Sequence, residues 1–410
     1  MDVRSRSLPV EVQHHLNAKL YAALPLCVAL GHDARWWFQH RFVQLCGYQF
    51  ESQPKTHVFD FCDAFAYTEL LRPQRVERAV AEQLALTEFL ISSIDAGKYP
   101  IVMVDNAMLT GTVPAIREFL VHGYSDAGQT LHIVGFGANA RFSALTFPTS
   151  EFEAAFGSAL ARMRDEPRTA LFKSSADDSQ VTHVIQVLSA PLADETASPA
   201  RIRRQVRAYL DGSRPADFDL NAGWWWYSRA SDVSRDAPVT FGIATYDYLI
   251  EHLQSHAGRQ GWHDYAMFHT HFEHKKLLLH RLRLLSPAVG EDPPARSYER
   301  LVTEVDRARL RVLMSERQGK PLPHDLVERF EGFRAAETEI LTAWLQQLHC
   351  RRSARSHRLV DVQRLVNHRG LAEPLDHGLA GRRAQARRQA GVEQQPEQRL
   401  AQPLRVLGRR

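Results

Sequence analysis

The stretch from Tyr99 to Phe156 constrains the fold more than any other part of the chain. It contains four short apolar runs separated by turns rich in Gly, Asp and Asn, at residues 101–104, 119–121, 131–134 and 142–147. Such runs are typical of successive strands joined by tight connections. Ser150 then stands where a helix N-cap would stand. We therefore predict an antiparallel strand meander that is closed by a helix over residues 151–163.

Helical spacing dominates the regions on either side of this meander. Before it, we predict helices within residues 10–50, a short strand at 57–61 and an amphipathic helix that opens at Pro73. After it, one more strand is expected at 170–173 or 181–188. Beyond residue 199 every strong pattern is helical, and the expected helices cover residues 202–209, 242–253, 265–285, 298–314 and 326–348.

These patterns predict an α+β fold with three parts. Residues 1–190 form an α/β domain, residues 200–350 an all-α domain, and the proline-bracketed segment 191–199 links them. The last part, residues 351–410, has 14 Arg, no Lys, five acids and no aromatic residue apart from His. Such a segment buries too little apolar surface to order itself, so we predict a disordered basic tail. An abrupt change of composition also fits an out-of-frame translation of GC-rich DNA.

Composition excludes several classes of protein. The chain has 410 residues and 44% hydrophobic content, which is ordinary for a two-domain globular protein. No apolar run reaches the roughly 18 residues of a membrane-spanning helix, and the N-terminus has no secretory h-region. Its four cysteines are scattered and form no CxxC pair, which argues against a disulfide framework or a structural zinc site. We therefore expect a cytoplasmic protein with no membrane partner.

Residues 12–190 resemble a known family. The helices followed by a strand meander that reads HGYSDAGQTLHIVGF are similar to the papain-like fold of acyltransferases of the butirosin biosynthesis protein H type, which are related in fold to bacteriocin-processing cysteine peptidases. The resemblance implies a Cys at the start of the first long helix and a His base, because a thiolate needs a neighbouring imidazole near neutral pH. Those positions fall near Leu16 and near Arg117, and neither holds the required residue.

Other residues are candidates for the missing roles. Cys27 lies further along the same helix, either as a nucleophile or as a buried thiol between apolar neighbours. The acidic residues that flank Cys62 disfavour formation of a thiolate at this position. His122 is a candidate base or a structural His, and Asp105 with Asn106 either orients an imidazole or forms a turn.

A second group of candidates suggests a metal site. His269 and Glu273 are spaced i,i+4 and His271 and His274 i,i+3, so each pair shares a helix face. The two faces differ by roughly 200° at 100° per residue, so zinc or iron would need ligands from another helix. The alternative is a polar face that makes hydrogen bonds between helices.

The consecutive aromatics Trp224, Trp225 and Trp226 cannot all face one core. Some of them should line a groove or an interface, or else cap the junction between the domains. We take these three and Arg117 as candidate binding residues.

The favoured function is an accessory protein of secondary-metabolite, nonribosomal-peptide-like biosynthesis. On the resemblance, it is related to acyl-transferring cysteine enzymes but is catalytically altered or binding-only, and its expected partner is an acyl or peptidyl carrier protein. One alternative is a metal-dependent helical enzyme that uses the histidine cluster, and another is a non-catalytic regulatory or scaffolding protein. No cofactor and no specific nucleic acid are expected, and the substrate and oligomeric state stay open.

Overall fold

The computed structural model of the protein describes residues 5–13, 16, 20–50, 53–63, 67–111, 115–139, 141–165, 183–190, 198–215, 239–256, 265–285 and 293–368. The chain contains helices and antiparallel sheets, and its contacts divide it into a compact unit of residues 1–347 and a second unit of residues 348–410. Among the described residues, none of the helices combines the length and the apolar character needed to span a membrane.

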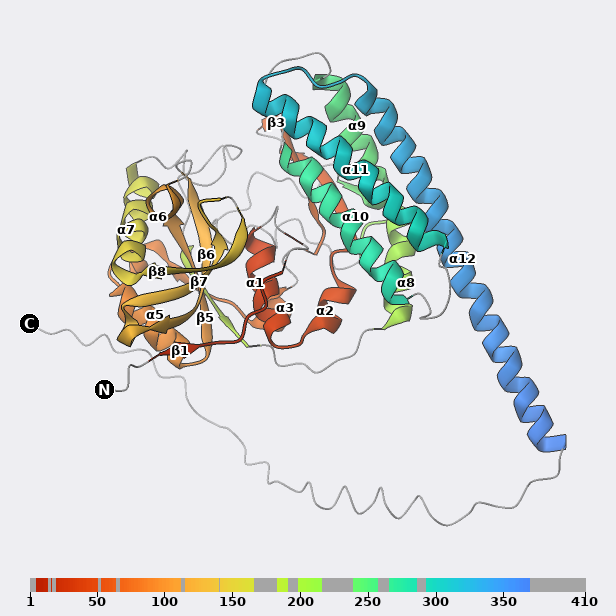
Figure 1. Ribbon diagram of the computed structural model, residues 1–410, viewed down its shortest axis with the longest axis horizontal. Coiled ribbons are helices and arrows are strands. Elements are labelled where there is room, and N and C mark those ends of the chain that lie inside the picture. Colours follow the sequence, from red (N-terminus) through yellow and green to blue (C-terminus); the bar gives the residue numbers. More distant parts are fainter. Residues whose placement is uncertain are drawn as a thin grey trace, which may run out of the picture. The chain divides into compact units, whose positions relative to one another are not determined.

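A seven-stranded sheet forms the core of one part of the first unit (Figure 1). Its strands run in the order β4-β9-β5-β6-β7-β8, and β1 pairs with the far end of β6. All the pairs are antiparallel. The strands are β1 (Arg6–Ser7), β4 (Gln74–Glu77), β5 (Lys98–Asp105), β6 (Ile116–Ser125), β7 (Thr130–Phe136), β8 (Phe142–Pro148) and β9 (His183–Ser189). The predicted meander is β5 to β8, and it is confirmed.

Helices pack against this sheet. Helices α5 (Leu86–Asp95) and α7 (Thr149–Asp165) contact β5 and each other, and α7 is the helix predicted to close the meander. Helix α1 (Leu20–Gly31) contacts β6, β7 and the short α3 (Tyr67–Leu71), whose Tyr67 reaches Gln186 of β9. Seven of the eight residues of β5 are buried, as expected for a central strand that is covered on both faces.

A second sheet joins distant parts of the sequence. The hairpin of β2 (Leu45–Phe50) and β3 (Gln53–Phe61) pairs through β2 with β10 (Thr240–Phe241). Residues 45–50 were expected to be helical, and that prediction is wrong. Helix α2 (Arg35–His40) ends because Phe42 adopts a positive φ of 61°, and the Asp63 carboxylate accepts the Phe42 N–H at 2.9 Å.

The predicted helix from Pro73 also begins later than expected. Residues 74–77 form β4 instead, because they pair with β9 at the edge of the large sheet. One turn of helix, α4 (Arg78–Ala81), follows, and α5 begins only at Leu86. The local helical spacing is thus overridden by a strand partner about 110 residues away in the sequence.

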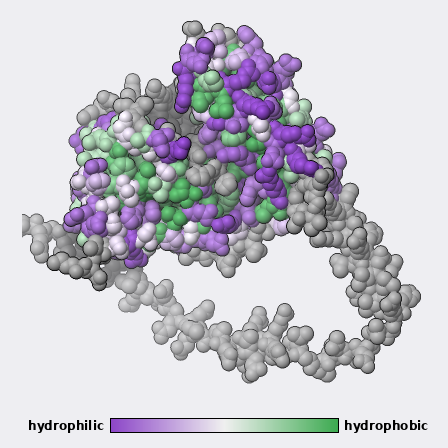
Figure 2. Space-filling model, in the orientation of Figure 1, coloured by the Kyte–Doolittle hydropathy of each residue, from purple (hydrophilic) through white to green (hydrophobic). Residues whose placement is uncertain are grey.

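Five helices account for most of the C-terminal half, close to the predicted positions. They are α8 (Pro199–Leu210), α9 (Thr245–His256), α10 (Tyr265–Leu285), α11 (Pro293–Gln318) and α12 (Asp325–His368). Short elements complete the described structure: α6 (Asn106–Thr110), η1 (Asp126–Gly128) and η3 (Gly242–Ala244). On the face shown in Figure 2, hydrophobic residues gather over the large sheet and hydrophilic residues over the helices.

The boundaries of the predicted domains differ from the structural units. Helix α10 packs on β3, and Tyr248 of α9 donates to the backbone oxygen of Tyr48 at 2.5 Å, so the hairpin β2–β3 belongs with the helical half. Contacts therefore group the predicted domain 1–190 and residues 200–347 of the predicted second domain in one unit. Helix α12 extends to His368, beyond the predicted helix end at residue 348. The linker residues 191–197 and the tail beyond 368 lie outside the described residues.

Candidate functional site

Helices α8 to α12 enclose a cluster of buried ionisable side chains around an ion pair. The ammonium of Lys275 on α10 lies 2.7 Å from the Glu337 carboxylate on α12, and both side chains are fully buried. Glu337 belongs to the apolar stripe of α12, next to Phe333 and Leu341. A buried charge requires such pairing, because isolated it would carry a large desolvation cost.

Three tyrosines surround this ion pair. Tyr209 of α8 accepts a hydrogen bond from Lys275 at 2.7 Å and donates to Glu337 at 3.3 Å. Tyr298 of α11 donates to the other carboxylate oxygen of Glu337. The ring of Tyr246 on α9 lies with its centroid 4.8 Å from the Lys275 nitrogen, in a cation–π contact. We call these residues and His274 the Lys275–Glu337 cluster.

Burial determines the acid–base behaviour of the cluster. It lowers the pKa of Lys275 to about 8, against the opposing effect of the Glu337 charge. Burial, reinforced by the same carboxylate, raises the pKa of Tyr209, Tyr246 and Tyr298 well above the ordinary value. The tyrosine hydroxyls are therefore neutral at neutral pH, while Lys275 is mainly a cation.

Residues of the cluster accept all the hydrogen bonds that the Lys275 ammonium can donate. The three N–H donors of the Lys275 ammonium meet Glu337, Tyr209 and, at 3.3 Å, Nδ1 of His274. His274 in turn donates from Nε2 to the Val43 carbonyl at 2.8 Å, which fixes its neutral tautomer. No donor of Lys275 is left for a substrate, so the arrangement ties five helices together rather than presenting an amine for chemistry.

The four predicted metal ligands do not converge. His269 and Glu273 lie 3.5 Å apart and face Arg309, whose guanidinium contacts His269 Nδ1 at 3.0 Å. His271 lies on the other side among the rings of Phe59, Tyr246 and Phe330. In the described part of the chain, no group of three or more His, Cys, Asp or Glu side chains could hold a metal. Among the described residues, the two helix faces meet aromatic rings and an arginine instead of further ligands.

His271 is also unusual as a buried polar residue. Its side chain is fully buried, and neither ring nitrogen has a hydrogen-bond partner among the described residues. Burial lowers its pKa well below the ordinary value, and the nearby Lys275 charge acts in the same direction. The ring is therefore neutral and fills space as an aromatic side chain would.

The predicted nucleophile Cys27 is closed off from solvent. It is 0% exposed within α1, and burial raises the pKa of its thiol to about 12. Burial also raises the pKa of Cys62, with help from Cys46 and the neighbouring acids. The thiolate is the reactive form of cysteine, and both Cys27 and Cys62 are protonated thiols near neutral pH.

The predicted base His122 occupies an irregular point of the sheet. The register between β6 and β7 shifts between Val121 and Gly123, which makes His122 a bulge residue. Its Nδ1 lies 3.4 Å from the Ser7 hydroxyl, and its ring lies 6.2 Å from that of His132. Burial lowers its pKa, so the imidazole is neutral.

Asp105 lies at the other end of the sheet from His122. The register pairs Asp105 with Ile116, which lies six residues before His122 along β6. At about 3.3 Å per residue that separation is roughly 20 Å. Asp105 instead caps α6 and holds two residues of α7, Ser158 at 2.9 Å and Arg162 at 3.1 Å. The structure therefore does not bring the predicted acid and base together.

The predicted binding residues have different outcomes. Arg117 is exposed on β6, opposite Val104 of β5. Trp224, Trp225 and Trp226 lie outside the described residues.

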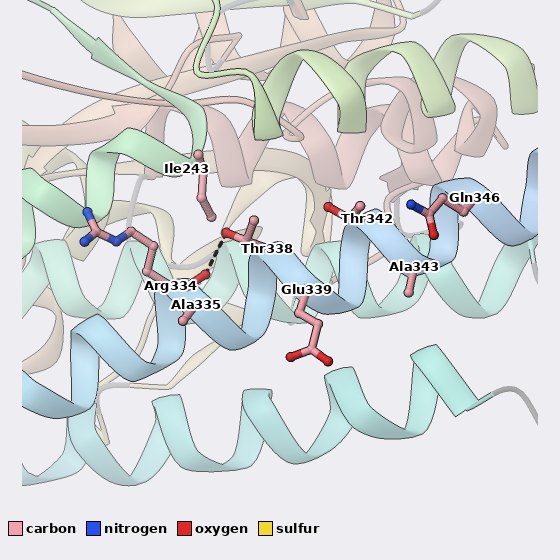
Figure 3. A pocket seen from close by; sticks show the side chains of 8 residues that line it. All are labelled: Ile243, Arg334, Ala335, Thr338, Glu339, Thr342, Ala343 and Gln346. Carbon is pink, nitrogen blue, oxygen red and sulfur yellow. Dashed lines mark hydrogen bonds between the residues drawn. The ribbon is translucent and has the colours of Figure 1, made fainter.

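A surface groove of about 560 Å³ runs along α12 (Figure 3). Short side chains dominate its lining, which consists of Ile243, Arg334, Ala335, Thr338, Glu339, Thr342, Ala343 and Gln346. The Thr338 hydroxyl donates a hydrogen bond to the Arg334 carbonyl at 2.8 Å, and the Arg334 guanidinium pairs with Asp247. None of the Lys275–Glu337 cluster lines this groove, so it gives no access to the buried ion pair.

Sequence reasoning missed the Lys275–Glu337 cluster, although a signal was present. Glu337 stands at a position of α12 where the stripe of Phe330, Phe333 and Leu341 requires an apolar residue. Charged residues are almost never fully buried unless they are paired, so this position predicts a buried cation on a neighbouring helix.

Comparison of the chain with protein-family models, curated proteins and solved structures finds no match.

Proposed function

We propose that the protein is an accessory factor of secondary-metabolite biosynthesis that binds an acyl or peptidyl intermediate on its carrier protein and does not form a thioester on a cysteine. The proposal includes a papain-like ancestry for the α/β part. Helix α1, which contains Cys27, packs on β6 and β7, as the resemblance to the acyltransferase family implies. The family's chemistry would need an exposed or activated thiol on that helix.

One observation carries the binding-only form of the proposal. The Cys27 thiol is fully buried and its pKa is about 12, while Asp105 and His122 lie towards opposite ends of the sheet. A thiol with that pKa is about one part in 10⁵ thiolate at pH 7, from one factor of ten per pH unit. Acyl transfer through this residue would therefore be negligible.

The Lys275–Glu337 cluster supports the same conclusion. Buried groups with shifted pKa values are often catalytic, but structural ion-pair networks shift pKa values too. Here the side chains of both ion-pair partners are 0% exposed, and each N–H donor of Lys275 has a partner inside the protein. Such a closed network favours a rigid scaffold for binding over a site for chemistry.

Titration with a carrier protein tests the binding claim. An acyl-loaded carrier protein should bind the wild type with a saturable heat in calorimetry, and Cys27→Ala should bind with the same affinity because the thiol contacts no ligand. Absence of saturable binding to the wild type would refute the proposal. A large loss of affinity in Cys27→Ala would refute the binding-only form of it.

A further inference from the structure

Helix α8 has an unusual concentration of positive charge on one face. Its 12 residues include Arg201, Arg203, Arg204 and Arg207 and no acid. The opposite face contains Ile202, Val206 and Tyr209, which are buried. At 100° per residue the four arginines span about 160° centred opposite this buried stripe. We call them the α8 arginine face; Arg204 and Arg207 are exposed and the other two are half-buried.

The arginine face works against the stability of its own helix. Arg201 lies in the first turn, where the helix dipole favours negative charge, and only Arg207 lies in the last turn, where the dipole favours a cation. The spacings Arg203–Arg207 and Arg204–Arg207 place like charges on neighbouring turns, which is mildly destabilising. In the described part of the chain no ion pair offsets these charges, whereas surface arginines elsewhere, such as Arg283 and Arg329, do pair with acids. Intramolecular stability therefore does not explain the pattern.

The backbone under this face is firmly held. Tyr209 belongs to the Lys275–Glu337 cluster, and Gln205 donates to the His40 carbonyl at 2.5 Å. At the start of the helix, the Ser198 hydroxyl accepts a hydrogen bond from the Arg201 N–H, and the backbone N–H of Ser198 donates to the His40 ring. A surface held in this way loses little conformational entropy when it binds a partner.

We propose that the α8 arginine face is the docking surface for an acidic protein, with carboxylates that pair with its guanidinium groups. Arginine favours such partners, because its planar fork matches a carboxylate with two hydrogen bonds. The inference rests on the proposed function, in which this acidic protein is the carrier protein that presents the intermediate.

The observations favour a protein over a nucleic acid or a membrane. The helix is about 18 Å long at 1.5 Å per residue, which suits a small complementary surface. The whole chain has a net charge of +4, of which the last 60 residues contribute +9, so the preceding 350 residues are acidic. The acidic body repels the parts of a long polyanion or of an anionic bilayer that extend beyond α8, whereas a carboxylate patch of the size of α8 meets only the basic face.

A charge-neutralised variant and a matched control test this proposal by titration with an acidic, acyl-loaded carrier protein. The variant is Arg203→Gln/Arg204→Gln/Arg207→Gln. The control, Arg283→Gln/Arg307→Gln/Arg329→Gln, removes the same charge from exposed arginines that pair with acids. Circular dichroism checks that both stay folded, and the α8 variant should fold well since it loses internal repulsion.

The expected result is a loss of affinity of about tenfold or more in the α8 variant, a shallower salt dependence, and a change within about twofold in the control. Equal affinities for variant and wild type, or equal losses in variant and control, would overturn the docking surface and leave the proposed function standing. Tighter binding of a DNA duplex or of anionic vesicles than of the carrier protein would overturn the choice of partner. A wild type that binds no carrier protein would instead refute the proposed function itself.

Discussion

At the scale of single residues, Lys275 shows why a charge can be retained inside a helical core. Its partners come from α8, α9 and α12 and from His274 on its own helix, so removing the ammonium leaves several polar groups facing one another. Replacing both members of a buried pair by apolar residues is often neutral, whereas breaking it is costly. The cluster therefore contributes more to the specificity of helix packing than to net stability.

The variant Lys275→Met tests this reasoning. It should lower the free energy of unfolding by about 3–5 kcal/mol, because Glu337 stays buried without its cation. Urea denaturation followed by circular dichroism measures the change. The double variant Lys275→Met/Glu337→Leu should recover most of the loss, and Arg283→Gln, which breaks an exposed pair, should cost under about 1 kcal/mol. Equal losses in the single and double variants would contradict a role for the unpaired charge.

At the scale of elements, the strand meander was predictable because its signals are local. Each of β5 to β8 has its own apolar run and its own turn, whereas Ser150, the predicted N-cap, lies inside α7, which begins at Thr149. The hairpin β2–β3 was not fully predictable, since residues 45–50 continue the helical spacing of α2. What decides their conformation is the positive φ of Phe42 and the distant acceptor Asp63, which no short window of sequence reports.

The candidate site was harder to predict than the fold. Tyr209 and Tyr298 fit the apolar stripes of their helices. The sequence pattern therefore does not reveal that their hydroxyls share one acceptor. The spacing of His269, His271 and His274 suggested a metal and drew attention away from Lys275, which directly follows His274. Cys27 could be judged a poor nucleophile from its apolar flanks, and its burial agrees with that reading. Side chains that meet across five helices leave only weak traces in each helix alone.

Close packing between β6 and β7 gives a test at this scale. A Cβ at Gly135 would lie 2.2 Å from the ring of Phe119, which is fully buried. Gly135→Ala should therefore lower the free energy of unfolding by about 1–3 kcal/mol, through overpacking. Gly157 on α7 has nothing within 4 Å of such a Cβ, so Gly157→Ala should instead stabilise by about 0.5–1 kcal/mol. Thermal unfolding of the two variants would contradict this account if Gly135→Ala were as stable as the wild type.

At the scale of the whole molecule, three neutral histidines of α10 should make stability fall in acid. Burial lowers the pKa of His269 to about 4 and those of His271 and His274 well below the ordinary value. The unfolded chain then binds more protons below about pH 6.5, so the contribution is complete above that pH and is lost as the pH falls towards 4. Each histidine adds a slope of up to about 1.4 kcal/mol per pH unit. Urea unfolding between pH 7.5 and 4.5 measures the sum.

Buried carboxyls act in the opposite direction. Burial raises the pKa of Asp63 to about 6 and also raises that of Glu118, so protonation of these groups favours the folded state in the same window. The variant His271→Phe separates the two effects. It should leave the free energy of unfolding unchanged or raise it at pH 7.5, because His271 lies among aromatic rings. In acid it should reduce the number of protons taken up on unfolding, which the slope of the unfolding free energy against pH measures, by about one. An unchanged slope would show that His271 does not titrate on unfolding.

We propose above all that this chain binds an acyl or peptidyl intermediate without taking it onto a cysteine. The most direct measurement is intact mass spectrometry of the protein after incubation with an excess of acyl-loaded carrier protein, followed by removal of the carrier. We predict the unmodified mass at every time point up to several hours, because the Cys27 thiol is buried and its pKa is about 12. A mass increase equal to one acyl group, mapped to Cys27 and absent from Cys27→Ala, would contradict the account.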